Sequence, residues 1–361
     1  MPTPPPPWVI RAALATRAFL LKLVNAITPP ELMVLERATG VAFTMSTAAL
    51  AKHYVPLLEG GAISADEIAR QLKRDPDSTF RFLHLMASAG FLTMRPDRRF
   101  EHNKVSRVLV RGHHSRAAHF VEYFASESNV RSWIDMDRTL VTGRNAFERV
   151  HGKSVWTWFD EHPGERECFA EAMMGFTLGD APFVAAGYPF KEVASICDIG
   201  GGRGTLVSEL LLRHPHLRAT LVDAPGVLDL ARALLEHRGV ADRVTLTPGN
   251  FFQQVPSGAG LYTLKNVLHD WDDERSIVIL KTIRAAVQPG QKVLIVESFI
   301  NRHQPDPMVA GADMQMMMVC NEGRERTEAD FRRLLTDSGF TPGRTFPHPV
   351  VSMIEGIAQP G

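Results

Sequence analysis

The segment ICDIGGGRGTL, which runs from Ile196 to Leu206, decides the fold of this chain. An apolar run ends in Asp198, four glycines follow within five residues, and the stretch TLVSELLLRHP comes next. Glycine lets a chain turn sharply and lets a ligand lie against the backbone where a Cβ atom would collide. The segment therefore predicts a strand, a tight ligand-binding loop and a helix.

The C-terminal half of the chain alternates predicted strands with predicted helices. Apolar strand candidates lie at residues 194–199, 218–222, 243–247, 260–264 and 291–297, and helical stretches lie near 205–213, 226–237 and 273–287. This alternation predicts an α/β fold with a doubly wound parallel sheet, whose ligands bind at the carboxyl ends of the strands. The polar residues at those ends are Asp198, Asp223, Asn250, Lys265, His269 and Glu297.

The first third of the chain is predicted to be helical. Helices are expected over residues 8–27, 31–39 and 43–58, where apolar positions recur at helical spacing or alanine is frequent. Ser64 and Glu67 have the spacing of a capping box, which predicts a helix from residue 65 to about 72. A further helix near 77–89 and a hairpin over 91–103 complete the pattern of a winged helix.

A winged helix often binds DNA, so a DNA-binding regulator is a second possible class of function. The expected recognition helix offers only Arg81 as a cation, whereas phosphate binding needs several. The 40 basic and 40 acidic residues cancel, which gives no electrostatic argument for a nucleic-acid or acidic-membrane partner. These observations favour a packing or dimerisation module over a DNA-binding one.

The middle of the chain, residues 119–189, is predicted to be helical and carries aromatic and methionine side chains. Phe169, Met173 and Phe176 share one helix face, and Trp133 precedes them. Such a stripe is most often part of a core. Because this one comes just before the glycine loop, it also suits the wall of a ligand site, and both interpretations stay open.

The chain carries no sign of export or of membrane insertion. Basic residues interrupt the apolar N-terminal run, and no stretch reaches the length of a membrane span. Cys168, Cys197 and Cys320 are far apart, which excludes a disulfide framework or a zinc ribbon and suits a reducing compartment. A cytoplasmic protein is expected.

The glycine loop also narrows the class of cofactor. A dinucleotide-binding turn reads GxGxxG, whereas here Asp198 stands two residues before the first of the glycines 200, 202 and 204. An acid there suits a cationic ammonium, such as the methionine end of S-adenosylmethionine, and would repel a pyrophosphate. Asp223 ends the second strand, where it can accept hydrogen bonds from ribose hydroxyls. A dehydrogenase remains the alternative.

His269 is the candidate catalytic base. It lies in LKNVLHDWDDE, after the fourth strand and before a helix whose expected N-cap is Asp272. A lone histidine is more often structural, but Asp270 adjoins this one, Glu297 ends the next strand and Glu325 follows in GRERTEADF. A histidine held by carboxylates can take the proton of a phenol, whose pKa is about 10.

Six motifs of the chain resemble, in order and spacing, those of the S-adenosylmethionine-dependent O-methyltransferases of plant phenylpropanoid and bacterial polyketide pathways. They are DIGGGRGTL, LVDAPGVLD, GNFF, LKNVLHDWDDE, VLIVE and GRERTEADFRRLL. The resemblance covers nearly the whole chain. It implies a winged-helix dimerisation domain at residues 1–115, a helical connector lining the acceptor pocket at 116–190, and a Rossmann-like catalytic domain with a mostly parallel seven-stranded sheet at 191–361.

The resemblance further implies methylation of a phenolic hydroxyl on a small aromatic secondary metabolite by a homodimer, with His269 as the base and Glu297 and Glu325 orienting it. The residues implied for the cofactor are Asp198, Gly200, Gly202, Gly204, Asp223, Asn250, Phe251 and Lys265. Those implied for the acceptor are Trp133, Phe169, Met173, Phe176, Asp270, Met316, Cys320 and Asn321. Asn250 departs from the aspartate usual in the family, and its amide can donate as well as accept.

Two rival activities resemble this one. Relatives that keep the cofactor but hydroxylate or decarboxylate are expected to lose the histidine and its acids, and all three are present here. A ring nitrogen, as in phenazines, is another conceivable methyl acceptor. No metal is expected, because the sequence has no His, Asp and Glu cluster with ligand spacing.

Overall fold

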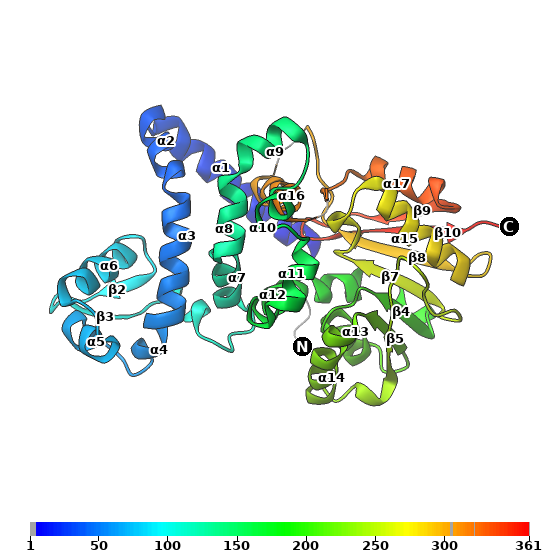
Figure 1. The fold of residues 1–361 in the computed structure, drawn as a ribbon, viewed down its shortest axis with the longest axis horizontal. Helices are drawn as coiled ribbons and strands as arrows, with labels where there is room; N and C mark the ends of the chain where they lie inside the picture. Colours follow the sequence, from blue (N-terminus) through cyan, green and yellow to red (C-terminus); the bar gives the residue numbers. More distant parts are fainter. Residues whose placement is uncertain (1–4, 304–305, 321, 361) are drawn as a thin grey trace. The chain divides into compact units, whose positions relative to one another are not determined.

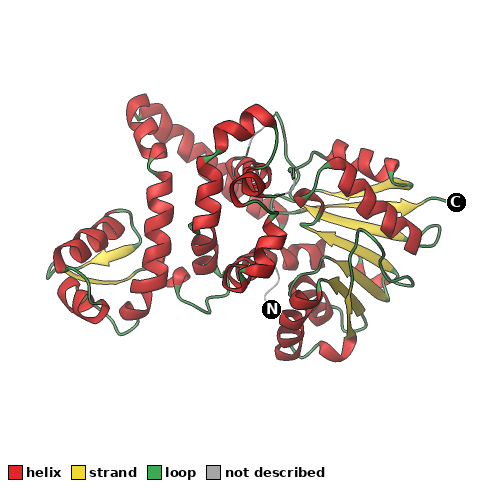
Figure 2. Cartoon of the chain, viewed as in Figure 1, coloured by secondary structure: helices red, strands yellow, loops and turns green. Residues whose placement is uncertain are grey.

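The computed structural model describes residues 5–303, 306–320 and 322–360. The chain falls into two compact units, each made of segments that are separate in sequence (Figures 1 and 2). The sheet unit comprises Met1–Ala13, Arg131–Trp158 and Thr177–Gly361. The helical unit comprises Leu14–Val130 and Phe159–Phe176.

The sheet unit is built on a seven-stranded sheet of order β6-β5-β4-β7-β8-β10-β9. Its strands are β4 (Ser195–Ile199), β5 (Arg218–Asp223), β6 (Val244–Pro248), β7 (Leu261–Lys265), β8 (Lys292–Glu297), β9 (Phe340–Phe346) and β10 (Ser352–Ala358). The first five in the spatial order pair in parallel, and β10 is antiparallel to both β8 and β9. The five strands predicted from the apolar runs, and the mostly parallel sheet, are confirmed.

Helices cover both faces of this sheet (Figure 1). Alternate strand residues point to opposite faces, as for Ile196 and its neighbour Cys197, which belong to different core clusters. One face packs against α13 (Thr205–Arg213), α14 (Pro225–His237) and the C-terminal part of α12 (Pro163–Gly187). The other packs against α15 (Asp273–Ala286) and α17 (Glu328–Asp337). The sheet is therefore doubly wound, as predicted.

Side-chain caps fix where the helices around the site begin. Asp272 accepts a hydrogen bond from the backbone of Arg275 at 2.7 Å, so it is the N-cap of α15, as predicted. Thr327 and Asp330 form a reciprocal capping box at the start of α17. The remaining elements of this half are α16 (Pro307–Val319) and the short 3-10 helices η3 (Phe190–Glu192), η4 (Ala241–Arg243) and η5 (Leu268–Asp270).

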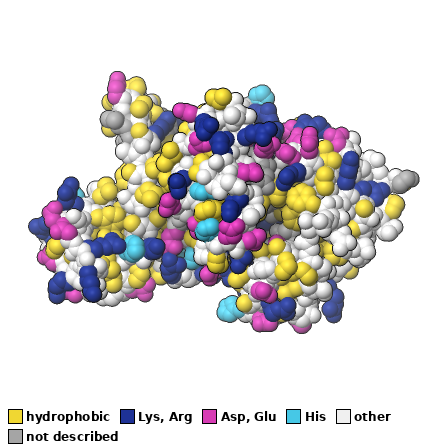
Figure 3. Space-filling view, viewed as in Figure 1, with side chains coloured by type: hydrophobic (Ala, Val, Ile, Leu, Met, Phe, Trp, Pro, Cys, Tyr) yellow, Lys and Arg dark blue, Asp and Glu magenta, His cyan; other side chains and the backbone are white. Residues whose placement is uncertain are grey.

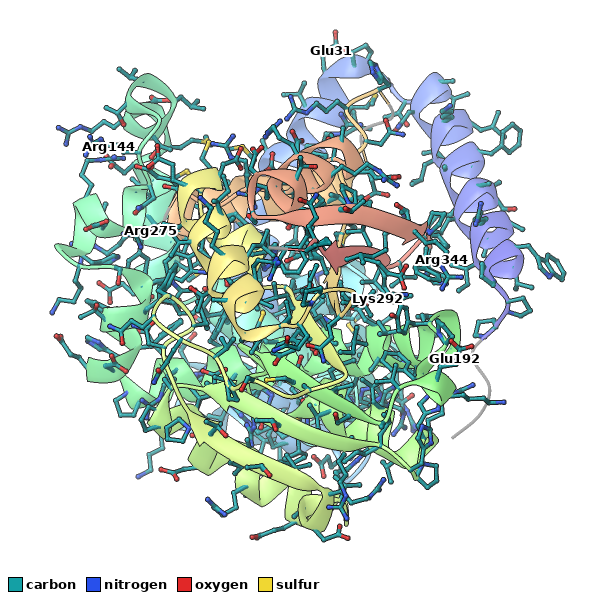
Figure 4. The ribbon with its side chains drawn as sticks, turned by 90° about the vertical axis from the view of Figure 1, so that its right-hand side faces the viewer. Glu31, Arg144, Glu192, Arg275, Lys292 and Arg344 are labelled. Atoms are coloured by element: carbon teal, nitrogen blue, oxygen red, sulfur yellow. The ribbon has the colours of Figure 1, made fainter. Side chains whose placement is uncertain are left out.

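A buried carboxylate ties the antiparallel edge of the sheet together. Glu355 on β10 accepts from the hydroxyl of Tyr188 at 3.1 Å and from Nζ of Lys292 at 2.7 Å. Lys292, on β8, and Arg344, on β9, are labelled in Figure 4. Arg344 adds a backbone hydrogen bond to the same carboxylate. Burial of this acid is thus compensated by neighbouring donors.

The N-terminal part of the chain is a run of helices, as predicted. They are α1 (Pro7–Ile27), α2 (Pro30–Ala38), α3 (Gly40–Ala49), the π-helical turn η1 (Leu50–Tyr54) and α4 (Val55–Leu58). The expectation of one regular helix over residues 43–58 is wrong in detail, because the π-helical turn interrupts it. Such turns are rare and leave no periodic pattern in sequence.

The elements expected of a winged helix follow in order. They are β1 (Ile63–Ser64), α5 (Ala65–Leu72), α6 (Pro76–Ser88), β2 (Leu92–Met94), β3 (Arg99–His102) and the 3-10 helix η2 (Ser106–Leu109). Ser64 accepts from the backbone of Glu67 at 3.2 Å, so the N-cap is confirmed. The reciprocal half of the capping box is wrong, because the Glu67 carboxylate binds Arg70 and Gln71 instead.

Helices also fill the middle of the chain, as predicted. They are α7 (Ala117–Phe124), α8 (Glu127–Ile134), α9 (Met136–Thr142), α10 (Ala146–His151), α11 (Val155–Glu161) and α12 (Pro163–Gly187). The helical unit has its own core, which includes the buried side chains Leu50, Ile68, Leu83 and Phe100.

In the described parts of the chain, every helix is too short or too polar to cross a bilayer. Acidic and basic side chains alternate over the surface in Figure 3.

Candidate active site

The glycine loop between β4 and α13 brings backbone close to several strand ends. Gly200, Gly202 and Gly204 all have positive φ angles, of 67°, 57° and 77°, which favour glycine. A Cβ atom on Gly200 would lie 2.9 Å from Val267, whereas one on Gly202 would meet no atom within 4 Å. The loop therefore packs tightly at one end and borders open space at Gly202.

Asp198, the last acid before the loop, is buried beneath it. Its Oδ1 accepts a hydrogen bond from the hydroxyl of Thr263 at 2.6 Å. Burial raises the pKa of Asp198 to about 6, although the Thr263 hydrogen bond and the charge of Lys265 oppose the shift. A cation brought to Oδ2 would offset the cost of burying this charge.

Asp223, at the end of β5, joins the loop to the neighbouring strand. Its Oδ2 accepts from the backbone N–H of Gly202 at 2.8 Å, and its Oδ1 accepts from Ala224 at 2.7 Å. Burial raises the pKa of Asp223, while these two backbone hydrogen bonds lower it. Each oxygen keeps a second lone pair, so the carboxylate can still accept hydrogen bonds from ribose hydroxyls.

Asn250 and Phe251 follow β6, the strand next to β5. The side-chain Oδ1 of Asn250 accepts from the backbone N–H of Phe252 at 2.9 Å, and the amide nitrogen of the same side chain is a hydrogen-bond donor. The Phe251 ring lies 3.6 Å from the position of a Cβ atom on Gly200. Both residues thus stand at the same sheet edge as the glycine loop, as predicted.

Lys265, at the end of β7, is held by an ion pair. Its Nζ lies 3.1 Å from Oδ2 of Asp180 on α12, and the lysine side chain is 5% exposed. The hydroxyl of Thr177 lies 3.4 Å from the same nitrogen. These contacts fix the ammonium at the sheet edge, a placement that the sequence predicted without its partners.

His269 lies on the 3-10 turn η5 and is surrounded by carboxylates. Its Nδ1 is 2.9 Å from Oε1 of Glu325 and 3.8 Å from Oε2 of Glu297. Its Nε2 is 3.7 Å from Oδ1 of Asp270. The structure thus brings Glu297 and Glu325, which are distant in sequence, to the adjacent pair His269 and Asp270, and all four are predicted site residues.

Burial alone would lower the pKa of His269, but the charges of Glu297, Glu325 and Asp270 raise it to about 10. Glu297 is fully buried, and burial raises its pKa to about 7. Its Oε1 accepts from the backbone of Val267 and of Leu268, each at 3.1 Å. Glu297 therefore fixes the turn itself as well as the charge around His269.

The sheet unit contains four of the residues predicted to bind the acceptor. Trp133 donates from Nε1 to Oε1 of the buried Gln315 at 2.8 Å. Met316 is half-buried on the same helix, α16. Cys320 is buried and its thiol donates to Oδ1 of Asp270 at 3.4 Å, which places both beside His269. The fifth candidate on this side, Asn321, lies outside the described residues.

The remaining acceptor candidates belong to the helical unit. Phe169 packs against Tyr123 and Phe159, with ring centroids 5.2 Å and 4.9 Å away. Phe176 makes an edge contact with Phe120 and is 40% exposed, and Met173 is half-buried. The stripe is therefore core at its Phe169 end and more exposed at its Phe176 end, and its role toward an acceptor stays a prediction.

Two residues that matter to this geometry were missed. A Cβ atom on Gly201 would lie 2.5 Å from Oδ2 of Asp198, so this glycine leaves that oxygen uncovered. Arg326 is almost fully buried and donates to the backbone of the turn that carries His269. The neighbouring Glu325 drew attention to the same motif, but a sequence does not show that an arginine is buried.

Within the described ranges, His269, Glu297 and Glu325 are also the group of side chains with ligand atoms close enough for a metal ion. The hydrogen bond from His269 to Glu325 and the backbone bonds to Glu297 already use part of this set. Arg275, labelled in Figure 4, lies over the ring of Trp271, the residue that follows η5, with its guanidinium carbon 5.4 Å from the ring centroid.

Comparison with known proteins identifies the family. The sequence profile of the O-methyltransferase domain matches residues 133–341. The mitomycin biosynthesis 6-O-methyltransferase of Streptomyces lavendulae is 36% identical over 292 residues, covering 81% of this chain and 83% of the relative. The solved structure of the mitomycin 7-O-methyltransferase MmcR superposes with a TM-score of 0.84 at 33% identity, covering 96% of this chain and 99% of the other.

The solved O-methyltransferase NcsB1 of neocarzinostatin biosynthesis, in complex with S-adenosyl-L-homocysteine and 1,4-dihydroxy-2-naphthoic acid, superposes with a TM-score of 0.78 at 26% identity. The superposition covers 90% of this chain and 98% of that one. The glycine loop and the acids beside it suit the same cofactor. The chain belongs to the O-methyltransferase family and is an S-adenosylmethionine-dependent O-methyltransferase.

Proposed function

We propose that this enzyme methylates a phenolic hydroxyl of a small aromatic secondary metabolite, and that His269 is the general base. The single observation that carries the proposal is the hydrogen bond of 2.9 Å between Nδ1 of His269 and Glu325, with Glu297 and Asp270 close by. A histidine oriented in this way by carboxylates is suited to proton abstraction.

The carboxylate of Glu325 selects the tautomer. An ionised carboxylate only accepts hydrogen bonds, so the proton of the neutral imidazole stays on Nδ1, which donates to Glu325. Nε2 is then left as the acceptor for the proton of the substrate. The charges of Glu297, Glu325 and Asp270 raise the pKa of His269, so its imidazole is a stronger base toward a phenol than an ordinary histidine is.

The bound S-adenosylmethionine supplies an electrophilic methyl group on a sulfonium. The phenolic proton passes to Nε2 of His269, the oxygen forms a bond to the methyl carbon, and the carbon–sulfur bond breaks to leave S-adenosylhomocysteine. The protein aligns the reactants and excludes water, which can contribute roughly 7–11 kcal/mol to the barrier reduction.

The cofactor is proposed to lie along the carboxyl ends of β6, β5, β4 and β7. Asp198 would hold the ammonium, and Asp223 would hold the ribose hydroxyls. Gly200, Gly202 and Gly204 would cradle the cofactor against backbone. In this arrangement Asn250 and Phe251 stand beside the adenine, and Lys265 stands on the side facing β7. The open space at Gly202 supports this placement.

An aromatic substrate is supported by the acceptor candidates and by the relatives. Trp133 and Met316, with Cys320 and Asp270 beside the base, would contact the acceptor, and Phe169, Met173 and Phe176 are further candidates for this role. One relative is an O-methyltransferase of mitomycin biosynthesis, another is a 3-amino-4-hydroxybenzoate 4-O-methyltransferase, and the solved NcsB1 binds 1,4-dihydroxy-2-naphthoic acid. We infer a phenolic intermediate of antibiotic-like biosynthesis as the substrate class.

The proposal is tested with His269→Gln and with His237→Gln, a control on the exposed end of α14. Methyl transfer from labelled S-adenosylmethionine to a panel of phenols and heterocycles is measured, together with S-adenosylhomocysteine affinity by calorimetry. We expect His269→Gln to lose about 10²-fold or more in kcat while its affinity for S-adenosylhomocysteine is retained. Full activity in this variant, or label found only on a ring nitrogen, would contradict the proposal.

The proposal extends to the whole chain. Residues 1–115 would dimerise, 116–190 would line the acceptor pocket, and 191–361 would bind the cofactor and carry out catalysis. We infer a cytoplasmic homodimer that needs no metal, nucleic acid or membrane. The three free thiols suit a reducing compartment, and a chelator is expected to leave the rate unchanged.

A further inference from the structure

The segment Gly323–Arg326, which carries Glu325, binds the backbone of the turn that carries His269. Arg324 donates its N–H to the carbonyl of His269 at 2.8 Å. A Cβ atom on Gly323 would lie 2.3 Å from the same carbonyl oxygen, so only glycine allows this close approach. The two chain segments are therefore in direct backbone contact beside the His269–Glu325 hydrogen bond.

Arg326 completes this contact with its side chain. Its Nη1 donates to the carbonyl of Leu268 at 2.6 Å, and its Nη2 donates to the carbonyl of Trp271 at 2.8 Å. His269 lies between these two carbonyls in the chain. The planar guanidinium thus hydrogen-bonds the turn on both sides of the base. The compact ammonium of a lysine could not reach both carbonyls in this way.

Arg326 is buried, and each of its side-chain nitrogens donates a hydrogen bond. The side chain is 1% exposed, and its Nε donates to Oδ1 of Asp273 at 2.9 Å. Its own carbonyl accepts from the backbone of Ile300 at 3.0 Å, in the segment that follows Glu297 and β8. Arg326 therefore connects all three segments that supply His269, Glu297 and Glu325.

We propose that Arg326 is a positioning residue, which holds the His269 turn at the distance and angle at which Nδ1 meets Glu325. The turn η5 is only a three-residue 3-10 helix, so its own hydrogen bonds do little to fix the ring. The inference rests on the proposed role of His269 as the base. It assigns to Arg326 an effect on catalysis without contact with substrate.

The test is Arg326→Lys, with Arg333→Lys as the matched control. Arg333 also pairs with Asp273, at 2.8 Å, but its side chain is 53% exposed and its second partner is Asp330, on its own helix α17. We expect Arg326→Lys to lower kcat about 10- to 100-fold, with KM and S-adenosylhomocysteine affinity little changed. The acid limb of its pH–rate profile should move to lower pH, because a looser carboxylate raises the pKa of His269 less. Arg333→Lys should match the wild type.

A double-mutant cycle separates positioning from general damage to the fold. If Arg326 acts through the His269–Glu325 pair, Arg326→Lys should cost much less in kcat when Glu325→Gln is already present. An additive loss, or a wild-type pH profile in Arg326→Lys, would overturn the proposal. Activity retained by His269→Gln would instead refute the base itself, a result measured independently of Arg326.

A second variant covers the case in which Arg326→Lys fails to fold, as judged by loss of S-adenosylhomocysteine binding. Asp273→Asn keeps the guanidinium but weakens its hold, because the ion pair at 2.8 Å is lost. We expect a smaller loss of kcat and a shift of the pH profile in the same direction. An unchanged profile in Asp273→Asn would then decide against the positioning role.

Discussion

His269 is unusual in having three carboxylates around a single imidazole. Glu325 hydrogen-bonds Nδ1, while Glu297 and Asp270 lie within 4 Å of one or other ring nitrogen. Burial raises the pKa of Glu297 to about 7 and that of Asp270 to about 6. The acids therefore have a double effect: they make the imidazole a stronger base, and they hold its proton in the resting enzyme.

The pH dependence of the reaction follows from this balance. Only the neutral imidazole accepts a proton, so the rate should rise as pH increases through the raised pKa of His269, about 10. Glu325→Gln removes one negative charge and lowers that pKa. We expect the acid limb of log kcat/KM to move to lower pH by about one unit, while the limiting rate falls.

Glu328→Gln is the control for this experiment, because Glu328 begins α17 and its carboxylate pairs with Arg332, away from the histidine. The same phenol is used throughout, so its own ionisation cancels in the comparison. If the acid limb of the pH profile does not move in Glu325→Gln, or moves equally in Glu328→Gln, then Glu325 does not set the pKa of His269.

Sequence alone could name the acids and the base at this site, because each lies at a strand end or in a distinctive motif. It could not find Gly201 or Arg326. Gly201 has an ordinary backbone conformation, so its importance comes only from the 2.5 Å between its would-be Cβ and Asp198. Arg326 reads as a surface cation until the fold buries it.

At the scale of elements, the glycine loop combines two separate requirements. Gly200, Gly202 and Gly204 are needed for their positive φ angles. Gly201 is needed for space, since a side chain there would press on a buried carboxylate that is held by Thr263 at 2.6 Å. A substitution at Gly201 should therefore change the affinity for S-adenosylhomocysteine as well as the free energy of unfolding.

Gly201→Ala is expected to weaken S-adenosylhomocysteine binding about 10-fold or more, because the new methyl group displaces or covers Oδ2 of Asp198. Gly239→Ala, at the end of α14, is the control: φ is 66° and a Cβ atom there meets nothing within 4 Å. It should lose about 1 kcal/mol in the free energy of unfolding, with unchanged affinity. Calorimetry and urea unfolding measure the two quantities. Equal affinities in both variants would refute the role of Gly201.

The sequence did not locate strands β9 and β10, and both were missed for the same physical reason. Strand β9 contains Pro342 and Gly343, and β10 contains Gly356, residues that usually mark turns or strand breaks. They are tolerated because β9 lies at the sheet edge and because Gly356 lets Leu335 approach closely. The parallel strands were predictable because their apolar runs are continuous, as expected for strands that are covered on both faces.

At the scale of the molecule, the sheet unit and the helical unit each have a core of their own, but α1 contributes to neither. None of its described residues is buried, and Trp8, Phe19 and Ile27 are 71%, 59% and 85% exposed. A 21-residue helix with large apolar side chains on its surface needs a cover in water. A second copy of the chain is the occupant proposed above.

The whole-molecule prediction is therefore that the protein is a dimer that depends on α1. Phe19→Glu combined with Val24→Glu places two charges on exposed apolar positions, 59% and 53% exposed, and should convert the dimer to a monomer at micromolar concentration. Burying one unpaired charge costs several kcal/mol, enough to lower association by more than about 10²-fold per site. Val278→Glu on α15, at a position 44% exposed, is the control and should leave the dimer intact. Sedimentation equilibrium decides between the outcomes, and a wild-type protein that is monomeric at high concentration would refute the proposed assembly.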